Sequence, residues 1–517
     1  MCPAPLFTSD PSEYTKLEGL YITETAPQGF IAGADRGTVG IVGATVRGPV
    51  DRAVEITSPA RFLEVFGGRD YTANGTGGAL INEIWEAMLG KPFGKLVIVR
   101  ATALAALKAS FTLETLANGT GVEVLRVDAS SPGVWGNSVK IKVEAATDGD
   151  ATHFNLRLKY LGETKLYENL NITTGNDNTL VVVGDDDANW ITLTKLASGT
   201  PITTGMAGLD SEGFVNLGQT VASFTSVLGT DGTIADADYT GSGRGINVIK
   251  DYRGVAVVMV AKRATTAVKA AMLTAAQAAS DRMFLIWNGT LGASVAAVVA
   301  DAALYRSDRV VYCYNSPYVL DTQTAQQIQV PPHAQLASIF SQTRHNKHVG
   351  SVATKKFTAG IMKLTFESLT RQDYKDLRAA GICALERSAS TSGGFVFVSG
   401  VTTNLTPGLT EIARRRSADF LQLSAASRLE EFVKEDNTDD TRAAMGGELV
   451  AFCDSLRRAN DTVEEFSIDQ VTPNTALSRA QGLEFIEWRV KLIGHILGLV
   501  LRTQIGTGTT IAEDSAA

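Results

Sequence analysis

Three short segments carry residues whose types and spacing could perform chemistry. Segment 75–78 (Gly-Thr-Gly-Gly) precedes an apolar helical pattern, as phosphate-binding loops do, but the chain has no GxxxxGK(S/T) sequence and no acidic residue suitably placed for a ribose. His345 and His348 stand three residues apart, and a metal site would need a third ligand that no nearby HExxH sequence or cysteine supplies. Both patterns are more often structural than functional.

The third segment is the basic run Arg414, Arg415 and Arg416. It could bind a phosphate or a carboxylate, but such a run on a helix is more often solvated or faces a partner protein. The chain also has no GxSxG sequence for a serine hydrolase. We therefore expect no enzyme, no cofactor and no metal. The alternative is an α/β enzyme that uses the 75–80 loop together with His333 or His348.

The composition narrows the class of protein further. The chain has 517 residues, 44% of them hydrophobic and 20% charged, which predicts several folded domains rather than a disordered chain or a coiled coil. A net charge of −8 gives no general attraction to nucleic acid or to a membrane surface. The first ten residues lack the basic start and apolar core of a Sec signal peptide, and no apolar run approaches the ~20 residues of a membrane span. We expect a soluble protein that folds in a cytoplasm.

Helices and strands must position the candidate residues described above. The first of these along the chain predict a parallel α/β sheet. Buried strands at 39–46 and 96–100 flank a short helix that Ser58 and Pro59 open and Gly67 ends, and a second helix with an apolar stripe over 80–89. A second strand–helix alternation covers 255–314. We expect both runs to pair in one sheet.

The remaining segments divide the chain into further parts. Residues 106–239 alternate with period two between turns rich in Gly, Asn and Asp, which predicts an inserted antiparallel β-sandwich. The last third predicts an α+β domain with a helix capped by Thr370, long helices near 410–434 and 440–459, and a strand near 488–492. The predicted parts are an N-terminal arm 1–24, a discontinuous α/β domain 25–105 and 240–358, the insertion 106–239, a C-terminal α+β domain 359–494 and a C-terminal arm 495–517.

Seven stretches in order along the chain together match the sequence pattern of one known family. The SPGxWGNS pattern at the start of the predicted insertion is the most specific, and His333 and Cys383 stand where the family pattern has Ser and Asn, as Glu18 stands for its Pro. The stretches are GLYITE at 19–24, VGAT at 42–45 with RGP at 47–49, FLEVFGG at 62–68, SPGVWGNS at 131–138, VPPHA at 330–334, the LT to GI run over 369–382, and Arg415-Arg416. Through them the chain resembles the tail sheath proteins of contractile bacteriophage tails.

The resemblance implies a fold and a function. It implies an α/β middle domain of the kind called subtilisin-like, without a protease triad, and a subunit that polymerises with itself as stacked hexameric rings around a tail tube. The sheath would then shorten and drive the tube through the host envelope for genome delivery. The implied partners are the tail tube, baseplate and tail terminator proteins. The implied location is the virion, with assembly in the host cytoplasm. A pyocin-like or other contractile injection particle is the alternative.

Assembly of this kind predicts site residues at both ends of the chain. The arms lack a core of their own, so we expect them to add strands to neighbouring subunits by β-augmentation. The resemblance places the C-terminal domain next to the tube, so Arg414, Arg415 and Arg416 are the candidate tube contacts. Cys2 lies in a polar arm, and we hypothesise an inter-subunit disulfide to Cys383 or Cys453, against the alternative of a free terminal thiol. The strand residues expected in the arms are Tyr21, Ile22, Val490, Leu492, Leu499 and Leu501.

Overall fold

The computed structural model describes most of the chain, and contacts divide it into two units. The described residues are 37–67, 95–279, 281–320, 325, 327–342, 344, 346–350, 360–388 and 394–496, with the backbone of two short strands nearer the N-terminus. One unit comprises residues 35–420 with 494–517, and the other comprises 421–493 with 1–34. The predicted helix at 80–89, the 75–78 segment and His345 lie outside the described residues.

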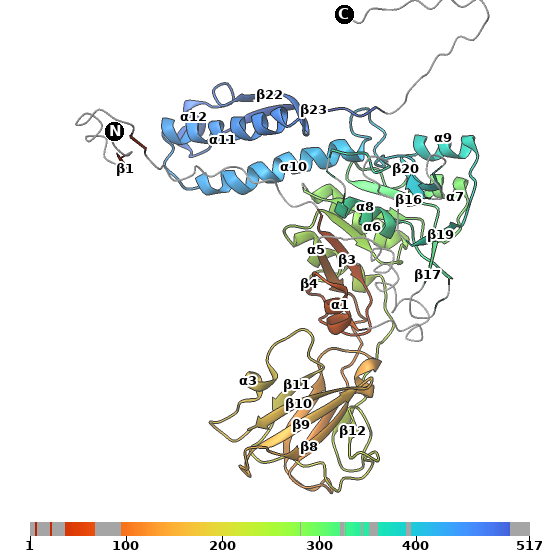
Figure 1. Ribbon diagram of the computed structural model, residues 1–517, viewed down its shortest axis with the longest axis vertical. Coiled ribbons are helices and arrows are strands. Elements are labelled where there is room, and N and C mark those ends of the chain that lie inside the picture. Colours follow the sequence, from red (N-terminus) through yellow and green to blue (C-terminus); the bar gives the residue numbers. More distant parts are fainter. Residues whose placement is uncertain are drawn as a thin grey trace, which may run out of the picture. The chain divides into compact units, whose positions relative to one another are not determined.

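An eight-stranded sheet forms the centre of the larger unit (Figure 1). The two predicted strand runs do pair in one sheet, because β14 is parallel to β3 with Val257 opposite Val39. Most neighbours are parallel, and every residue of the central strands is buried, as expected for strands covered on both faces. In sheet order the strands are β21 (Phe395–Phe397), β20 (Ile382–Arg387), β16 (Val310–Tyr314), β15 (Met283–Trp287), β14 (Val257–Val260), β3 (Val39–Gly43), β5 (Leu96–Arg100) and β4 (Ala53–Ile56).

Helices cover both faces of this sheet. Helices α1 (Pro59–Phe66) and α8 (His333–Gln342) contribute to one core, and α5 (Ile246–Asp251), α6 (Thr266–Ala278), α7 (Val295–Ala302) and α9 (Arg371–Ala379) contribute to the other. The predicted caps are confirmed: the Ser58 side chain accepts from the Arg61 N–H, and Thr370 forms a capping box with Asp373.

The strands within residues 106–239 pair in antiparallel fashion, as their period-two pattern predicts. Two four-stranded sheets enclose one apolar core that contains Trp135, Trp190 and Phe154. One sheet has the order β10 (Glu163–Leu170), β9 (Phe154–Tyr160), β8 (Lys140–Ala145) and β12 (Val215–Asn216), and the other has β11 (Ile191–Lys195), β7 (Glu123–Ala129), β6 (Ser110–Glu114) and β13 (Ser226–Val227).

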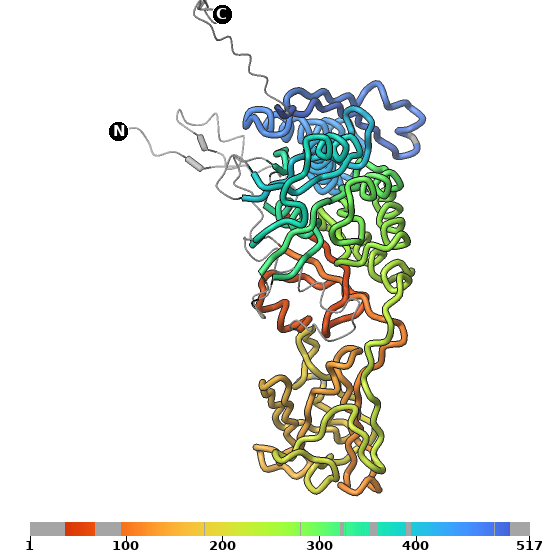
Figure 2. Tube along the Cα trace, turned by 90° about the vertical axis from the view of Figure 1, so that its right-hand side faces the viewer, coloured from red at the N-terminus to blue at the C-terminus, as the bar shows by residue number. Residues whose placement is uncertain are grey.

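The chain enters and leaves this insertion at one place. Leu107 and Thr230 form an isolated antiparallel bridge and exchange both backbone hydrogen bonds, at 3.0 and 3.1 Å. The outgoing and returning segments accordingly run side by side in Figure 2, as orange and yellow-green tubes. The insertion is therefore an excursion from the α/β sheet.

The predicted boundary of the C-terminal domain at residues 358 and 359 differs from the structure. Strands β20 and β21 follow that boundary in sequence, yet β20 pairs in parallel with β16 and extends the central sheet. Between β16 and β20 the chain adds a small antiparallel sheet of β18 (Gln327–Gln329), β17 (Pro317–Leu320) and β19 (Ile361–Leu364). The division by contacts falls after Phe420 instead.

The smaller unit is built from helices and one strand pair. Helix α10 (Ile412–Leu429) runs into it, followed by a 3-10 turn (Glu430–Phe432) and α11 (Asp439–Arg458). Strands β22 (Val463–Asp469) and β23 (Glu487–Leu492) pair in antiparallel fashion, and α12 (Ala476–Ala480) lies in the loop between them. Gly446 on α11 permits close approach, because a Cβ there would lie 2.3 Å from Gln470 Oε1.

Candidate assembly site

The pair β22 and β23 is the clearest candidate for receiving another strand. Within the described residues each strand has only the other as a partner, so the sheet has an open edge on both sides. Along β23 exposed and half-buried residues alternate, and Val490 and Leu492 lie on the half-buried face while Lys491 pairs with Glu464 at 2.6 Å. Unpaired edges of this kind are templates for pairing with another chain.

Exposed apolar side chains lie in the loop that joins these two strands. Asn474 closes the loop, because its Nδ2 donates to Phe485 O at 2.6 Å and its Oδ1 accepts from the Phe485 N–H at 2.8 Å. The apolar side chains left half-exposed or more are Val471, Leu477, Leu483 and Phe485. Several such residues in one segment indicate a surface that a partner covers.

The predicted arm residues are only partly described. Tyr21 and Ile22 do form a strand, β2 (Tyr21–Ile22), whose backbone pairs in parallel with β1 (Leu6–Phe7) of the same chain. Leu499 and Leu501 lie outside the described residues. Strand donation by either arm therefore stays a prediction.

The three consecutive arginines at the start of α10 have different environments. Arg414 is exposed. Arg415 pairs with Asp419 at 2.7 Å and Asp308 at 3.3 Å, and Arg416 is buried, with Nη2 donating to Phe340 O at 3.0 Å and its guanidinium 4.7 Å from the Phe340 ring centroid. Burial lowers the pKa of Arg416 to about 10. The structure thus corrects the interpretation of Arg415 and Arg416 as surface groups, and only Arg414 stays a candidate tube contact.

A buried charge network holds the root of α10. Asp419 accepts from Arg309 at 3.0 and 2.9 Å and from Arg415 at 3.0 and 2.7 Å. The side chains of Arg309 and Asp419 are 9% and 5% exposed, so this pair is held away from water, while Arg415 shares Asp419 and also pairs with Asp308. Arg415 and Arg416 therefore serve to anchor the helix.

The two cysteines named as acceptors of an inter-subunit disulfide, Cys383 and Cys453, are not accessible. Cys383 and Cys453 are fully buried, and burial raises their pKa values to about 12 and 11. Cys383 lies opposite Cys313 in the sheet and donates to Val401 O at 3.2 Å. Cys2 lies outside the described residues. In this conformation neither proposed acceptor thiol can meet an arm from a neighbour, which corrects that hypothesis.

The SPGVWGNS stretch forms the joint between the insertion and the α/β unit. Ser131 Oγ accepts from the Gly48 N–H at 3.0 Å, Trp135 Nε1 donates to Ser131 O at 3.2 Å, and Asn137 exchanges hydrogen bonds of 2.9 and 2.8 Å with Gly229. Gly133 has φ +136°, a conformation that L side chains rarely adopt. The Gly133 N–H also donates to Leu107 O at 3.1 Å, so the stretch contacts both the outgoing segment at Leu107 and the returning segment at Gly229.

Two buried arginines complete the joint from the α/β side. Arg100 donates to Gly48 O at 2.9 Å and to Pro132 O at 2.8 Å. Arg47 donates to Glu64 O at 2.8 Å and lies over the rings of Trp135 and Tyr160, at 5.8 and 5.4 Å from their centroids. Burial lowers the pKa of Arg100 to about 10. The carbonyl oxygens of Gly48 and Pro132 stabilise the buried guanidinium by accepting its hydrogen bonds.

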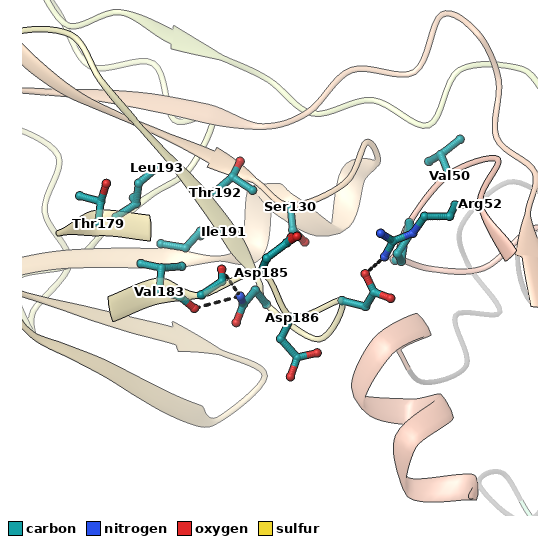
Figure 3. Close-up of a pocket in the computed structure, with 15 residues that line it drawn as sticks. Val50, Arg52, Ser130, Thr179, Val183, Asp185, Asp186, Ile191, Thr192 and Leu193 are labelled. Carbon is teal, nitrogen blue, oxygen red and sulfur yellow. Dashed lines mark hydrogen bonds and ion pairs between the residues drawn. The ribbon is translucent and has the colours of Figure 1, made fainter. Parts of the chain in front are cut away.

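A pocket of about 750 Å³ opens between β11 and the loop before β4 (Figure 3). Asp187 pairs with Arg52 across it, and Asp186 pairs with Arg61 of α1 at 2.7 Å. These carboxylates are thus used to tie loop 185–187 of the insertion to the α/β unit. No cluster of three or more His, Cys, Asp or Glu residues suited to a metal occurs in the part of the chain that the structure describes.

Two further sequence candidates have structural partners. One ring nitrogen of His348 accepts from the Gly400 N–H at 2.9 Å, and His333 is buried beneath the central sheet.

Among the described helices, none is long and apolar enough to cross a membrane.

The comparisons with known proteins concern the fold. No protein-family model and no curated protein matches the chain. Among solved structures, the sheath tail protein of Listeria innocua is similar with a TM-score of 0.58 and 13% identity over 89% of this chain and 96% of that one. The sheath tail protein of Desulfitobacterium hafniense is similar with a TM-score of 0.56 and 13% identity over 92% of this chain and 100% of that one.

Sheaths of other contractile particles are similar to the same extent. The helical sheath of the anti-feeding prophage in its contracted state gives a TM-score of 0.54 and 12% identity over 95% of this chain and 99% of that one. The PVC sheath, from an extracellular contractile injection system in the contracted state, is similar with a TM-score of 0.55 and 9% identity over 95% of this chain and 98% of that one. Nearly the whole chain therefore has the fold of the contractile tail sheath proteins.

Proposed function

We propose that the chain is the structural subunit of a contractile tail sheath. The observation that carries this proposal is the sheath fold over nearly the whole length of the chain. Copies polymerise as stacked hexameric rings around a tail tube, and the sheath contracts to drive the tube through a host envelope. The work comes from relaxation of a metastable extended assembly, so no ATP and no cofactor take part.

The open edges of β22 and β23 give this polymer its connections. An arm from a neighbour adds a strand to an edge and forms about five backbone hydrogen bonds, each contributing about 0.5–1.5 kcal/mol, or roughly 3–7 kcal/mol per arm. A contact that uses different surfaces on its two sides does not close on itself and generates a helical array. The exposed loop with Val471, Leu477, Leu483 and Phe485 adds apolar area to the same surface.

The partners follow from this assembly. The subunit binds other copies of itself, the tail tube, and the baseplate and terminator proteins at the two ends of the sheath. It is assembled in the host cytoplasm and ends in the virion. The likeness to the anti-feeding prophage and PVC sheaths supports a second candidate, the sheath of a contractile particle that carries no genome. Capsid and terminase genes beside the coding gene would favour the sheath of a phage tail. Their absence would favour the sheath of a particle without a genome.

Removal of either arm is expected to stop long-range polymerisation. Deletion of residues 1–22, or of the chain from Ile496, removes the donated strands and leaves the three described apolar cores intact, so the variants should stay folded while tubes shorten to rings or single subunits. Electron microscopy and sedimentation measure this, with the full-length chain as control. Normal tubes from either variant would show that the arm concerned does not link subunits. Single full-length subunits that form neither rings nor tubes would contradict the proposed function itself.

Charge reversal at Arg414 is expected to weaken attachment to the tube and to spare free sheath polymerisation. The side chain is exposed, and an exposed ion pair contributes only about 0–1 kcal/mol, so repetition over many subunits makes the effect measurable. The assay is co-sedimentation of Arg414→Glu sheath with purified tube. Lys375→Glu on α9, also exposed, is the matched control. Unchanged co-sedimentation of Arg414→Glu would remove this residue from the tube surface.

A further inference from the structure

Helix α8 is buried although its sequence is rich in polar residues. All residues from His333 to Phe340 are buried, including Gln335 and Ser338, and the helix packs against β14, β15 and β16. His333 is its first residue and follows Pro331 and Pro332. The contacts of His333 therefore determine how the first turn of α8 packs against the sheet.

The His333 imidazole makes one hydrogen bond and one ring contact. Its Nε2 lies 2.9 Å from Val260 O at the end of β14, and a carbonyl can only accept, so Nε2 carries the proton. The ring stacks on Trp287 at the end of β15, with centroids 6.1 Å apart and planes inclined by 13°. Nδ1 is buried and has no hydrogen-bond partner among the described residues. The site is thus built for a neutral ring with a single proton.

Among the described residues, no charged side chain acts on this ring to compensate a second proton. Strands β14 and β15 carry no ionisable side chain, and those of β16 and β20 that share its core are the thiols of Cys313 and Cys383. The tyrosines of β16 contribute to the opposite core, and on α8 itself the polar groups are uncharged. Arg416 contacts Phe340, near the other end of the helix. Burial is accordingly the main influence on His333 and lowers its pKa to about 4.

We propose that His333 is an acid-sensitive latch that pins the start of α8 to the ends of β14 and β15 and releases it when the imidazole gains a second proton. The added proton on Nδ1 finds no acceptor, and the resulting cation is buried beside an indole ring. The charged ring is stable only after α8 leaves the sheet. This device acts within one subunit and does not depend on the proposed function.

The sign of the pH dependence follows from the two pKa values. The folded-state pKa is about 4 and the ordinary value is 6.5, so the open state binds more protons between these limits. Opening of α8 therefore becomes more favourable as the pH falls through this window. From pH 7 to pH 4.5 the two values give a roughly 60-fold increase in the opening equilibrium.

Hydrogen exchange of the α8 amides in the full unassembled chain tests the latch. Mass spectrometry at pH 7 and pH 4.5, corrected for intrinsic exchange rates, should show about 60-fold weaker protection at the lower pH in the wild type. His333→Gln keeps a donor for Val260 O and cannot ionise, so its protection should be nearly independent of pH. His153→Gln is the matched control: His153 is a partly exposed histidine whose pKa is raised by Asp148, and its loss should leave the acid effect in place.

Equal acid sensitivity of α8 in the wild type and in His333→Gln would overturn the proposal. A direct measurement on the wild type covers the case in which the variant does not fold. The chain has five histidines, and the imidazole resonances assigned to His333 should titrate with a midpoint near 4, well below the ordinary value of 6.5. A midpoint near 6.5 would equally reject the latch.

Discussion

Replacement of Asp419 by alanine is expected to lower the free energy of unfolding of the 35–420 unit by about 3–5 kcal/mol. The variant leaves the Arg309 guanidinium, only 9% exposed, without its carboxylate, and Arg415 loses the same partner. A buried charge without a counter-charge is among the most destabilising changes that a single substitution can make. Urea denaturation of the unassembled chain at neutral pH measures the loss.

The matched control for Asp419 is Asp186→Ala. It also removes an aspartate paired with an arginine, at 2.7 Å, but both side chains are about a third exposed or more. Such a pair contributes about 0–1 kcal/mol, so the control should unfold close to the wild type. A loss below about 1 kcal/mol in Asp419→Ala would show that the network at the root of α10 is hydrated in solution.

Trp135→Ala is expected to destabilise the insertion by about 3–5 kcal/mol and to loosen its joint. The indole is 6% exposed, meets Tyr160 edge to face at 5.7 Å and lies under the Arg47 guanidinium. The substitution removes these contacts and the hydrogen bond to Ser131 O together. We expect the insertion to unfold in a separate, earlier transition, with new protease cleavage within 131–138.

A conservative variant separates the ring from its hydrogen bond. Trp135→Phe keeps an aromatic ring beneath Arg47 and loses only the Nε1 donor, so it should cost about 0.5–1.5 kcal/mol and preserve a single transition. If Trp135→Ala unfolded in one transition with the stability of the Phe variant, the joint would not depend on this ring.

Local signals in the sequence predicted local structure correctly. Ser58 and Thr370 are polar residues that directly precede a helix, and each side chain accepts the backbone N–H three residues later, as the predicted caps require. The period-two pattern around Val490 likewise predicted the strand with half-buried apolar residues. These features depend on neighbours in the chain, which a sequence displays directly.

Features that depend on distant partners were missed or assigned wrongly. Arg415 and Asp419 stand four apart on one helix, and that spacing could have indicated a pair, but Arg309 is 110 residues away from Asp419 and has no local signal. Helix α8 was missed because polar residues such as His333 and Gln335 interrupt its apolar pattern, although both are buried. The pairing of β20 with β16 was missed because a pattern of strands does not state which sheet they join.

The hydrogen-bonded pair of Leu107 and Thr230 has a consequence for how this chain can change over generations. Residues that exchange both hydrogen bonds across antiparallel segments have Cα atoms about 5.5 Å apart, so the two ends of the inserted sandwich nearly meet. A short turn in place of residues 108–229 would close the central sheet at a small cost in entropy. Recombination can therefore replace the sandwich by another domain, or delete it, without changing the strand order of the central sheet.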